Sequence, residues 1–192
     1  MRKILLSAAV AAAALAPAAA SAQTIPAAVI AVVNLERVTA ECNACKTASA
    51  ALRSQVTALE NRQRALGTPL EAEAKAIQAA VDALKGAQPD AALQARVRAF
   101  QQKQQQGSQE IQRQQQQIQR NQAYIQQQVG QKLGPIYQQV MQRRGANLMV
   151  ETGTTLAAGT SLDVTNDVLA ALNTALPTIA TTAPAQAAAP GR

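Results

Sequence analysis

The feature that most constrains this fold is a repeat of apolar residues through the middle of the chain. From Ala48 the repeat advances in alternating steps of four and three, which aligns its members along one side of an α-helix. A kink is expected at Gly67-Thr68-Pro69, because proline removes a helical hydrogen bond and clashes with the preceding turn. The repeat positions are Leu52, Val56, Leu59, Gln63, Leu66, Leu70, Glu73, Ile77, Ala80 and Leu84.

A turn at residues 85–90 divides the repeat. Gly86 can end one helix in the left-handed region, and Asp90 can cap a second helix that begins at about Ala91. Two helices joined by a short turn form an antiparallel hairpin, so residues 46–133 are predicted to form one arm with its tip at 85–90. Helices of ~40 residues would extend roughly 60 Å.

Glutamine dominates residues 101–131 and has two interpretations. One is a low-complexity, aggregation-prone tract. The other is a solvated helix face, which we favour because Ile111, Ile118 and Ile125 keep a heptad spacing and glutamine is a good helix former.

Strand-like segments lie on both sides of the arm. Residues 29–34 and 147–151 are short apolar runs typical of strands, and 156–158 is a weaker third candidate. A second kink is expected at Gly134-Pro135. The helix should then end at Arg143-Arg144-Gly145.

The strands must meet, because a lone strand leaves its backbone groups unpaired. Residues 23–45 and 134–176 are therefore predicted to form one small body, with Thr165 capping a short helix. The fold class is α+β and mostly helical. Few short strands leave open edges, which favours self-association. The expected oligomerisation residues are Ile30, Val32, Val33, Leu148 and Val150.

The two ends of the chain have their own compositions. Residues 1–22 have a positive start, an apolar run and an Ala20-Ser21-Ala22 ending, which predict a cleaved export signal and a periplasmic mature protein. No segment is long and apolar enough to predict a membrane span, although contact with a membrane surface stays open. Residues 177–192 are rich in Ala, Thr and Pro and are expected to be disordered.

The chemistry-bearing residues favour no enzyme, cofactor or metal site. The chain has no His, which removes the usual general base and the commonest metal ligand. Its formal net charge of +7 makes nucleic acid a candidate partner. However, the basic residues of the arm are spread singly, and an exported protein meets little nucleic acid. Acidic surfaces or unfolded acidic chains fit this charge better.

Cys42 and Cys45 form a Cys-Asn-Ala-Cys motif at the start of the predicted arm. A structural disulfide, within or between chains, is the favoured interpretation in an oxidising compartment. Zinc would need further ligands from other copies, and a redox role would need a supporting βαβ unit that is not predicted.

Three segments together resemble the Skp/OmpH family of periplasmic chaperones. They are Ile30-Ala31-Val32-Val33-Asn34, Asn147-Leu148-Met149-Val150 and the closing Leu162-Asp163-Val164-Thr165-Asn166-Asp167-Val168-Leu169, with the long hairpin between the first two. The resemblance covers roughly 28–174. It implies a homotrimer whose strands form a shared β-barrel body with three helical arms around a cavity. The Cys pair and the Ala/Pro tail depart from the family pattern.

The resemblance also implies a holdase that keeps unfolded outer-membrane proteins soluble without ATP. An arm with an interrupted apolar seam is compatible with many weak client contacts, and separated cations would attract acidic client segments. A structural envelope coiled coil that binds a folded partner is the alternative. The expected client-binding residues are Leu66, Leu70, Ile77, Val81, Leu84, Leu93, Val97, Phe100, Arg96, Arg98 and Lys103.

Overall fold

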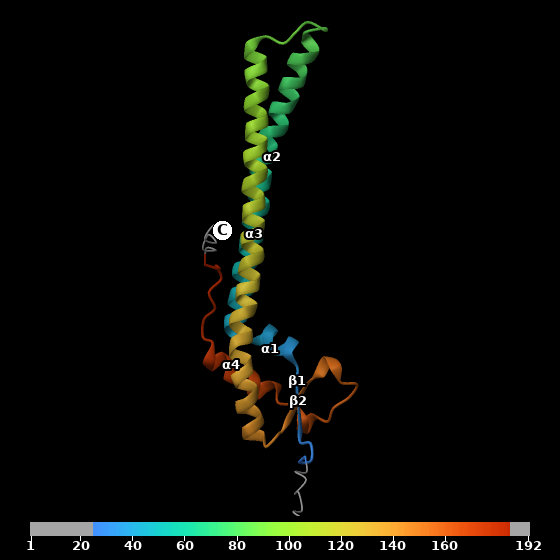
Figure 1. The fold of residues 1–192 in the computed structure, drawn as a ribbon, viewed down its shortest axis with the longest axis vertical. Coiled ribbons are helices and arrows are strands. Elements are labelled where there is room, and N and C mark those ends of the chain that lie inside the picture. The colour runs from blue at the N-terminus through green and yellow to red at the C-terminus, as the bar shows by residue number, and fades with distance from the viewer. Residues whose placement is uncertain (1–24, 185–192) are drawn as a thin grey trace, which may run out of the picture.

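The computed structural model describes residues 25–184 and contains one long helical hairpin that rises from a small body (Figure 1). Helices α2 (Asn43–Ala83) and α3 (Ala91–Arg144) form the hairpin. The body contains β1 (Ile30–Val33), α1 (Leu35–Glu41), β2 (Leu148–Glu151) and α4 (Thr165–Ala175), with 3-10 turns η1 (Thr152–Thr154) and η2 (Thr160–Leu162). The mostly helical α+β class is therefore confirmed.

The sheet joins the two segments that flank the arm. β1 and β2 run parallel, in a register that extends from Ile30 opposite Leu148 to Val33 opposite Glu151. The two strands expected from the sequence thus pair across the whole hairpin, which is inserted between them. Parallel strands need a long crossover, and the hairpin supplies it.

The expected third strand at 156–158 does not form. Leu156 is fully exposed, and this segment connects η1 to η2 without strand pairing. A single large apolar residue between glycines offers no alternating face to bury, which accounts for the difference. The other edge of β1 is instead bridged at Val32 by Asp163, and the Val164 N–H donates to the Val32 carbonyl at 2.9 Å.

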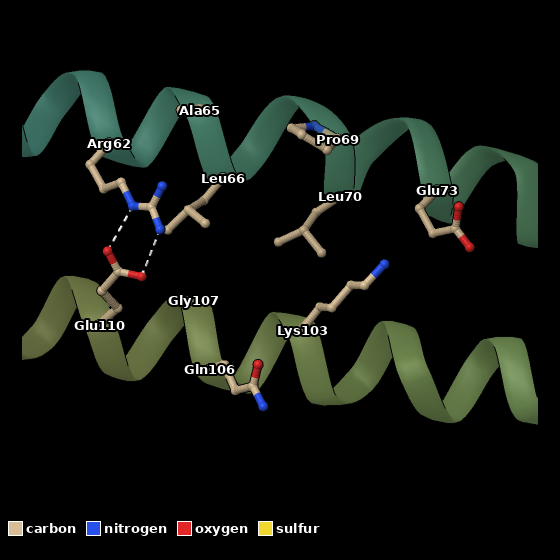
Figure 2. A pocket seen from close by; sticks show the side chains of 10 residues that line it. All are labelled: Arg62, Ala65, Leu66, Pro69, Leu70, Glu73, Lys103, Gln106, Gly107 and Glu110. Carbon is tan, nitrogen blue, oxygen red and sulfur yellow. Dashed lines mark hydrogen bonds and ion pairs between the residues drawn. The ribbon is translucent and has the colours of Figure 1, made fainter.

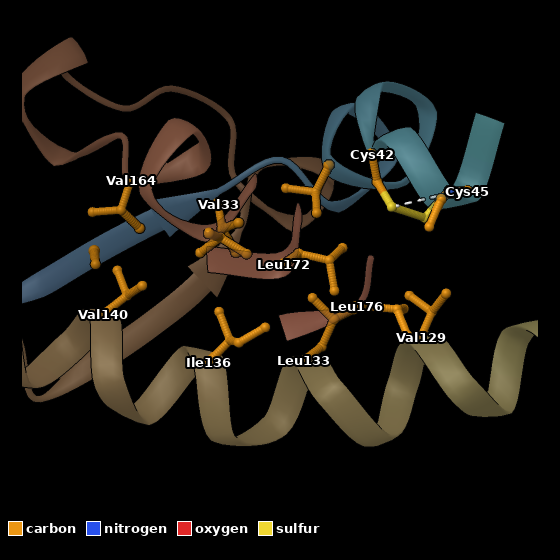
Figure 3. Packing of buried hydrophobic residues seen from close by; sticks show 14 residues of the cluster. Val33, Cys42, Cys45, Val129, Leu133, Ile136, Val140, Val164, Leu172 and Leu176 are labelled. Carbon is orange, nitrogen blue, oxygen red and sulfur yellow. Dashed lines mark hydrogen bonds between the residues drawn. A yellow bond between two sulfur atoms is a disulfide. The ribbon is translucent and has the colours of Figure 1, made fainter. Parts of the chain in front are cut away.

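The hydrophobic core lies where the base of α3 crosses the body (Figure 3). Val129, Leu133, Ile136 and Val140 follow one another at helical spacing and face β1, α4 and the Cys pair. Leu172 of α4 packs into the same cluster and is completely buried. The core therefore fixes the base of the arm to the sheet.

Side-chain hydrogen bonds define the start of α1 and connect the start of α4 to β1. Asn34 caps α1 by accepting from the Arg37 N–H at 2.8 Å. Thr165 does not cap α4 as expected: it is buried, and its Oγ1 accepts from the Asn34 N–H at 2.9 Å. Asp163 accepts from the Thr165 N–H at 2.8 Å, and its hydrogen bonds with Thr165 lower the Asp163 pKa. The closing motif thus ties α4 to the end of β1.

The tip of the hairpin and the end of α3 lie at the residues that the sequence predicts. At the tip Asp90 accepts from the Leu93 N–H at 2.7 Å, and Gly86 has a φ of 93°. At the other end of α3, Gly145 has a φ of 66° after a basic last turn. Both helices stay continuous through their prolines, Pro69 and Pro135, so neither expected kink interrupts a helix. Figure 1 shows α2 leaning away from α3 toward the tip.

Residues 177–184 differ from the disorder expected for the tail. They run back along the lower part of the hairpin (Figure 1) and form hydrogen bonds with α2 and α3. The rest of that tail, 185–192, and the expected export signal, 1–22, lie outside the described residues. Within the described part of the chain, no helix has the length and apolar character needed to cross a membrane.

Candidate binding arm and body surface

Most of the apolar residues predicted to bind clients lie at seam positions of the two arm helices. Most of their apolar side chains are half-buried, so each keeps part of its surface exposed. Val81 differs, because 41% of it stays exposed. The half-buried set is Leu66, Leu70, Ile77, Leu84, Leu93, Val97 and Phe100.

Near Pro69 of α2, the seam brings two leucines opposite a glycine. Leu66 and Leu70 point across toward α3, which presents Gly107 at this level (Figure 2). A Cβ on Gly107 would lie 3.7 Å from the Leu66 Cδ1 atom, so the glycine leaves space that a small side chain could fill. At this level the two leucines therefore face a position of α3 that has no side chain.

Clefts flank Leu66, Leu70 and Gly107 on both sides of the seam. One has a volume of about 380 Å³ and is also lined by Arg62, Glu73, Lys103 and Glu110. The other, of about 490 Å³, uses different residues of both helices but shares Leu66, Leu70 and Gly107. The same two leucines can thus be reached from either flank.

Two ion pairs bridge the helices beside the first cleft. Arg62 donates to the Glu110 carboxylate at 2.7 and 3.0 Å, and Arg96 donates to Glu73 at 2.7 and 3.1 Å. Hydrogen bonding from these guanidinium groups lowers the pKa of both glutamates. Among the predicted cationic residues, Arg96 therefore bridges the arm, while Arg98 and Lys103 remain exposed and form no ion pair within the described residues.

The body exposes an apolar surface at the edge of the sheet. Ile30 and Leu148 lie opposite each other in the register and are 40% and 44% exposed. Val150 is half-buried. The other predicted oligomerisation residues, Val32 and Val33, are buried within the chain, because Val33 faces the core and the β1 edge at Val32 is bridged by Asp163. The open apolar surface of the strands therefore consists of Ile30 and Leu148, with part of Val150.

Cys42 and Cys45 form a disulfide within the chain, at the junction of α1 and α2. Both residues are buried, and the Cys42 sulfur accepts from the Cys45 N–H. No group of potential metal ligands occurs among the described residues. The disulfide thus lies at the base of the arm, next to the hydrophobic core.

A row of carboxamide side chains was not predicted as a site. Gln55, Gln117, Asn121 and Gln128 form hydrogen bonds with residues 180–183 of the tail. The three α3 residues recur at helical spacing, but this signal is hidden among the many other glutamines of the sequence.

The architecture is a helical hairpin inserted between two paired strands of a small body. Comparison with known proteins identifies the family to which this architecture belongs. Residues 29–172 match the family model described as outer membrane protein (OmpH-like), so the chain belongs to the OmpH-like family. A solved structure with the same fold is that of a Caulobacter crescentus protein assigned as an OmpH-like outer membrane chaperone. It is 22% identical, with a TM-score of 0.67, and the match covers 82% of this chain and 90% of that one. No curated protein matches the chain.

Proposed function

We propose that the protein is a periplasmic, ATP-independent holdase that binds unfolded outer-membrane proteins along its arms and prevents their aggregation. The observation that carries this proposal is the half-open seam at Leu66 and Leu70, with a cleft on each flank. Membership of the OmpH-like family supports the proposal. The chaperone assignment of the Caulobacter protein agrees with it.

Weak, distributed contacts suit this task. Full burial of a Leu or Val side chain contributes about 1.5–3 kcal/mol, and a half-buried residue has only part of that left to offer a client. Several such residues on one arm can hold an unfolded chain without selecting a sequence. The exposed cations Arg98 and Lys103 would attract acidic client segments, and salt would weaken that attraction.

We further propose that the body assembles three copies into a shared β-barrel, so that three arms surround a cavity. Ile30 and Leu148 supply the exposed apolar surface on which the copies would meet. Light scattering should then give three times the mass of one chain at micromolar concentration. A stable folded monomer would contradict this assembly.

Dilution of a urea-unfolded outer-membrane protein into buffer tests the holdase proposal. A stoichiometric amount of the chaperone should abolish the increase in turbidity, and Leu66→Gln with Leu70→Gln should weaken this protection severalfold. Leu156→Gln, in the fully exposed loop of the body, is the matched control and should protect normally. Normal aggregation with the unmodified chain in excess would refute the proposal. Tight binding to a native partner would then favour the envelope scaffold.

A further inference from the structure

The tail holds an extended conformation against the hairpin. Ile179, Thr181 and Ala183 are half-buried, while the residues between them are exposed. This alternation has the period of a β-strand, whose side chains point to opposite faces in turn. However, its backbone is hydrogen-bonded to side chains of α2 and α3, where a strand would bond to another strand.

Gln128 acts toward Ala180 as a neighbouring strand would. The Ala180 N–H donates to Gln128 Oε1 at 3.0 Å, and Gln128 Nε2 donates to the Ala180 carbonyl at 2.9 Å. A carboxamide has a donor and an acceptor side by side. It can therefore satisfy both backbone groups of one extended residue, as paired residues of an antiparallel ladder do.

The same contacts continue toward the tip of the arm. The Ala183 N–H donates to Asn121 Oδ1 at 2.8 Å, and the Ala183 carbonyl accepts from Gln117 Nε2 at 3.5 Å. Gln55, on the other helix, donates to the Thr181 carbonyl at 3.2 Å. All five bonds end on backbone atoms of the tail, so the row recognises an extended main chain and no particular side chain.

The row is also held in place by its own hydrogen bonds. Asn121 is only 3% exposed; its Nδ2 donates to Gln55 Oε1 at 2.8 Å, and its Oδ1 accepts from Gln117 Nε2 at 2.7 Å. These bonds connect α2 with α3 and orient Gln55, Gln117 and Asn121 through contacts that do not involve the tail. A preorganised row loses less side-chain entropy on binding than free glutamines would.

We propose that Gln55, Gln117, Asn121 and Gln128, the carboxamide row, form a binding site for an extended polypeptide backbone. Residues 179–183 occupy the site in the free protein, and an extended segment of an unfolded client displaces them. The inference rests on the proposed function, because the displacing chain is the client. Unfolded strands of a membrane barrel fit the site, since they carry unpaired N–H and C=O groups until they fold.

The covalent link between the tail and α4 explains how the tail can cover the site and still be replaced by a client. A segment joined by a short linker has an effective concentration in the millimolar range, so the tail occupies the site although each bond is weak. A client that also contacts the apolar seam gains a second attachment and can replace the tail. The tail would thus exclude short peptides and admit long unfolded chains.

Full-length variants with prolines in the tail provide the test. Ala180→Pro with Ala183→Pro removes both N–H donors that the row accepts, without deleting any segment. Thr182→Pro is the matched control, because none of the five tail hydrogen bonds uses its N–H. Fluorescence anisotropy then measures the binding of a labelled synthetic peptide with the sequence of residues 177–184.

The double-proline chain should bind this peptide about tenfold more tightly than the unmodified chain or the Thr182→Pro control. A peptide N-methylated at the positions of Ala180 and Ala183 keeps the side chains but lacks both donors, and its affinity should fall about tenfold. Gln128→Ala in the double-proline chain should have a similar effect. Equal binding of the methylated and plain peptides would overturn the inference, as would equal binding by all three chains.

Aggregation assays on the same proteins separate this inference from the holdase proposal. If the double-proline chain binds the peptide but no variant protects an unfolded outer-membrane protein, the row still binds backbone and the holdase proposal fails. If protection is normal and the peptide does not bind, the holdase proposal stands and the carboxamide row is only a strap for the tail. Circular dichroism checks that each variant keeps its helices.

Discussion

The body and the arm are built from similar apolar periodicities but bury them to different extents. At the base of α3, apolar residues recur every three or four positions, and Val129, Leu133, Ile136 and Val140 are all buried. Along the arm, at residues 60–120, only Gly107 is buried, and it has no side chain. The seam there contains half-buried residues with polar ones between them. The contrast teaches that the body can supply the stability of the chain while the arm keeps apolar surface available.

The largest expected effect comes from matched truncations in the two regions. Leu172→Ala in the core should lower the free energy of unfolding by about 2–5 kcal/mol, because it leaves a cavity among buried side chains. Leu70→Ala in the half-open seam should cost clearly less, about 1 kcal/mol. Urea unfolding followed by circular dichroism measures both. Equal losses would show that the arm is packed as tightly as the body.

Reduction of the disulfide, which lies where the arm joins the body, should lower the stability of the protein. Cys42 and Cys45 close a short loop, and a loop of this length limits the expected stabilisation to about 2 kcal/mol. Reductant should lower the unfolding midpoint of the native chain and leave that of a Cys42→Ala, Cys45→Ala variant unchanged. Thiol titration of the denatured, unreduced protein should find no free thiol. Two free thiols would contradict the disulfide.

Gly107→Ala should sharpen the contrast by closing the seam. Replacing a glycine within a helix by alanine stabilises it by about 0.5–1 kcal/mol, and the new methyl group would contact Leu66. Gly130→Ala is the control, since its added methyl group has no neighbour within 4 Å. Both variants gain helix propensity, but only Gly107→Ala should slow hydrogen exchange around the clefts and weaken client binding. The same exchange pattern in both variants would show that the missing side chain at position 107 has no role in client binding.

The ion pairs of the arm give the smallest effect, and it depends on pH. The pKa values of Glu73 and Glu110 are lowered by their arginine partners, so their contribution is complete above the ordinary glutamate value of about 4.3. It is lost as the pH falls through the lowered values. Hydrogen exchange in the arm should therefore become faster relative to the body below about pH 4. Glu73→Gln with Glu110→Gln should remove this difference, and a difference that persisted would assign it to other groups.

Local chemistry made much of the fold predictable. Asp90, Gly86 and Gly145 mark helix ends through caps and backbone conformations that depend on the residue type alone. The two segments that form strands, 30–33 and 148–151, were also found, because short apolar runs differ sharply from the glutamine-rich arm. These signals need no knowledge of distant contacts.

Features that depend on distant contacts could not be predicted in the same way. Thr165 fits the pattern of an N-cap, yet its hydroxyl accepts from the Asn34 N–H, a partner far away in sequence. Periodicity identified the seam residues, but the exposed fraction of each depends on how closely the two helices pack. The tail was expected to be disordered by composition, because its contacts depend on residues that are distant in sequence, such as Gln128, which forms two hydrogen bonds with Ala180.

The holdase proposal requires that clients bind the arm and not the body, and site-specific crosslinking can distinguish the two. A photoreactive residue is placed in turn along 60–125, and at Leu156 in the body, before an unfolded outer-membrane protein is added. We expect strong crosslinks beside Leu66, Leu70 and Gly107, where the clefts flank the seam, and few at Leu156. Crosslinks concentrated at Leu156, with none along the seam, would contradict it.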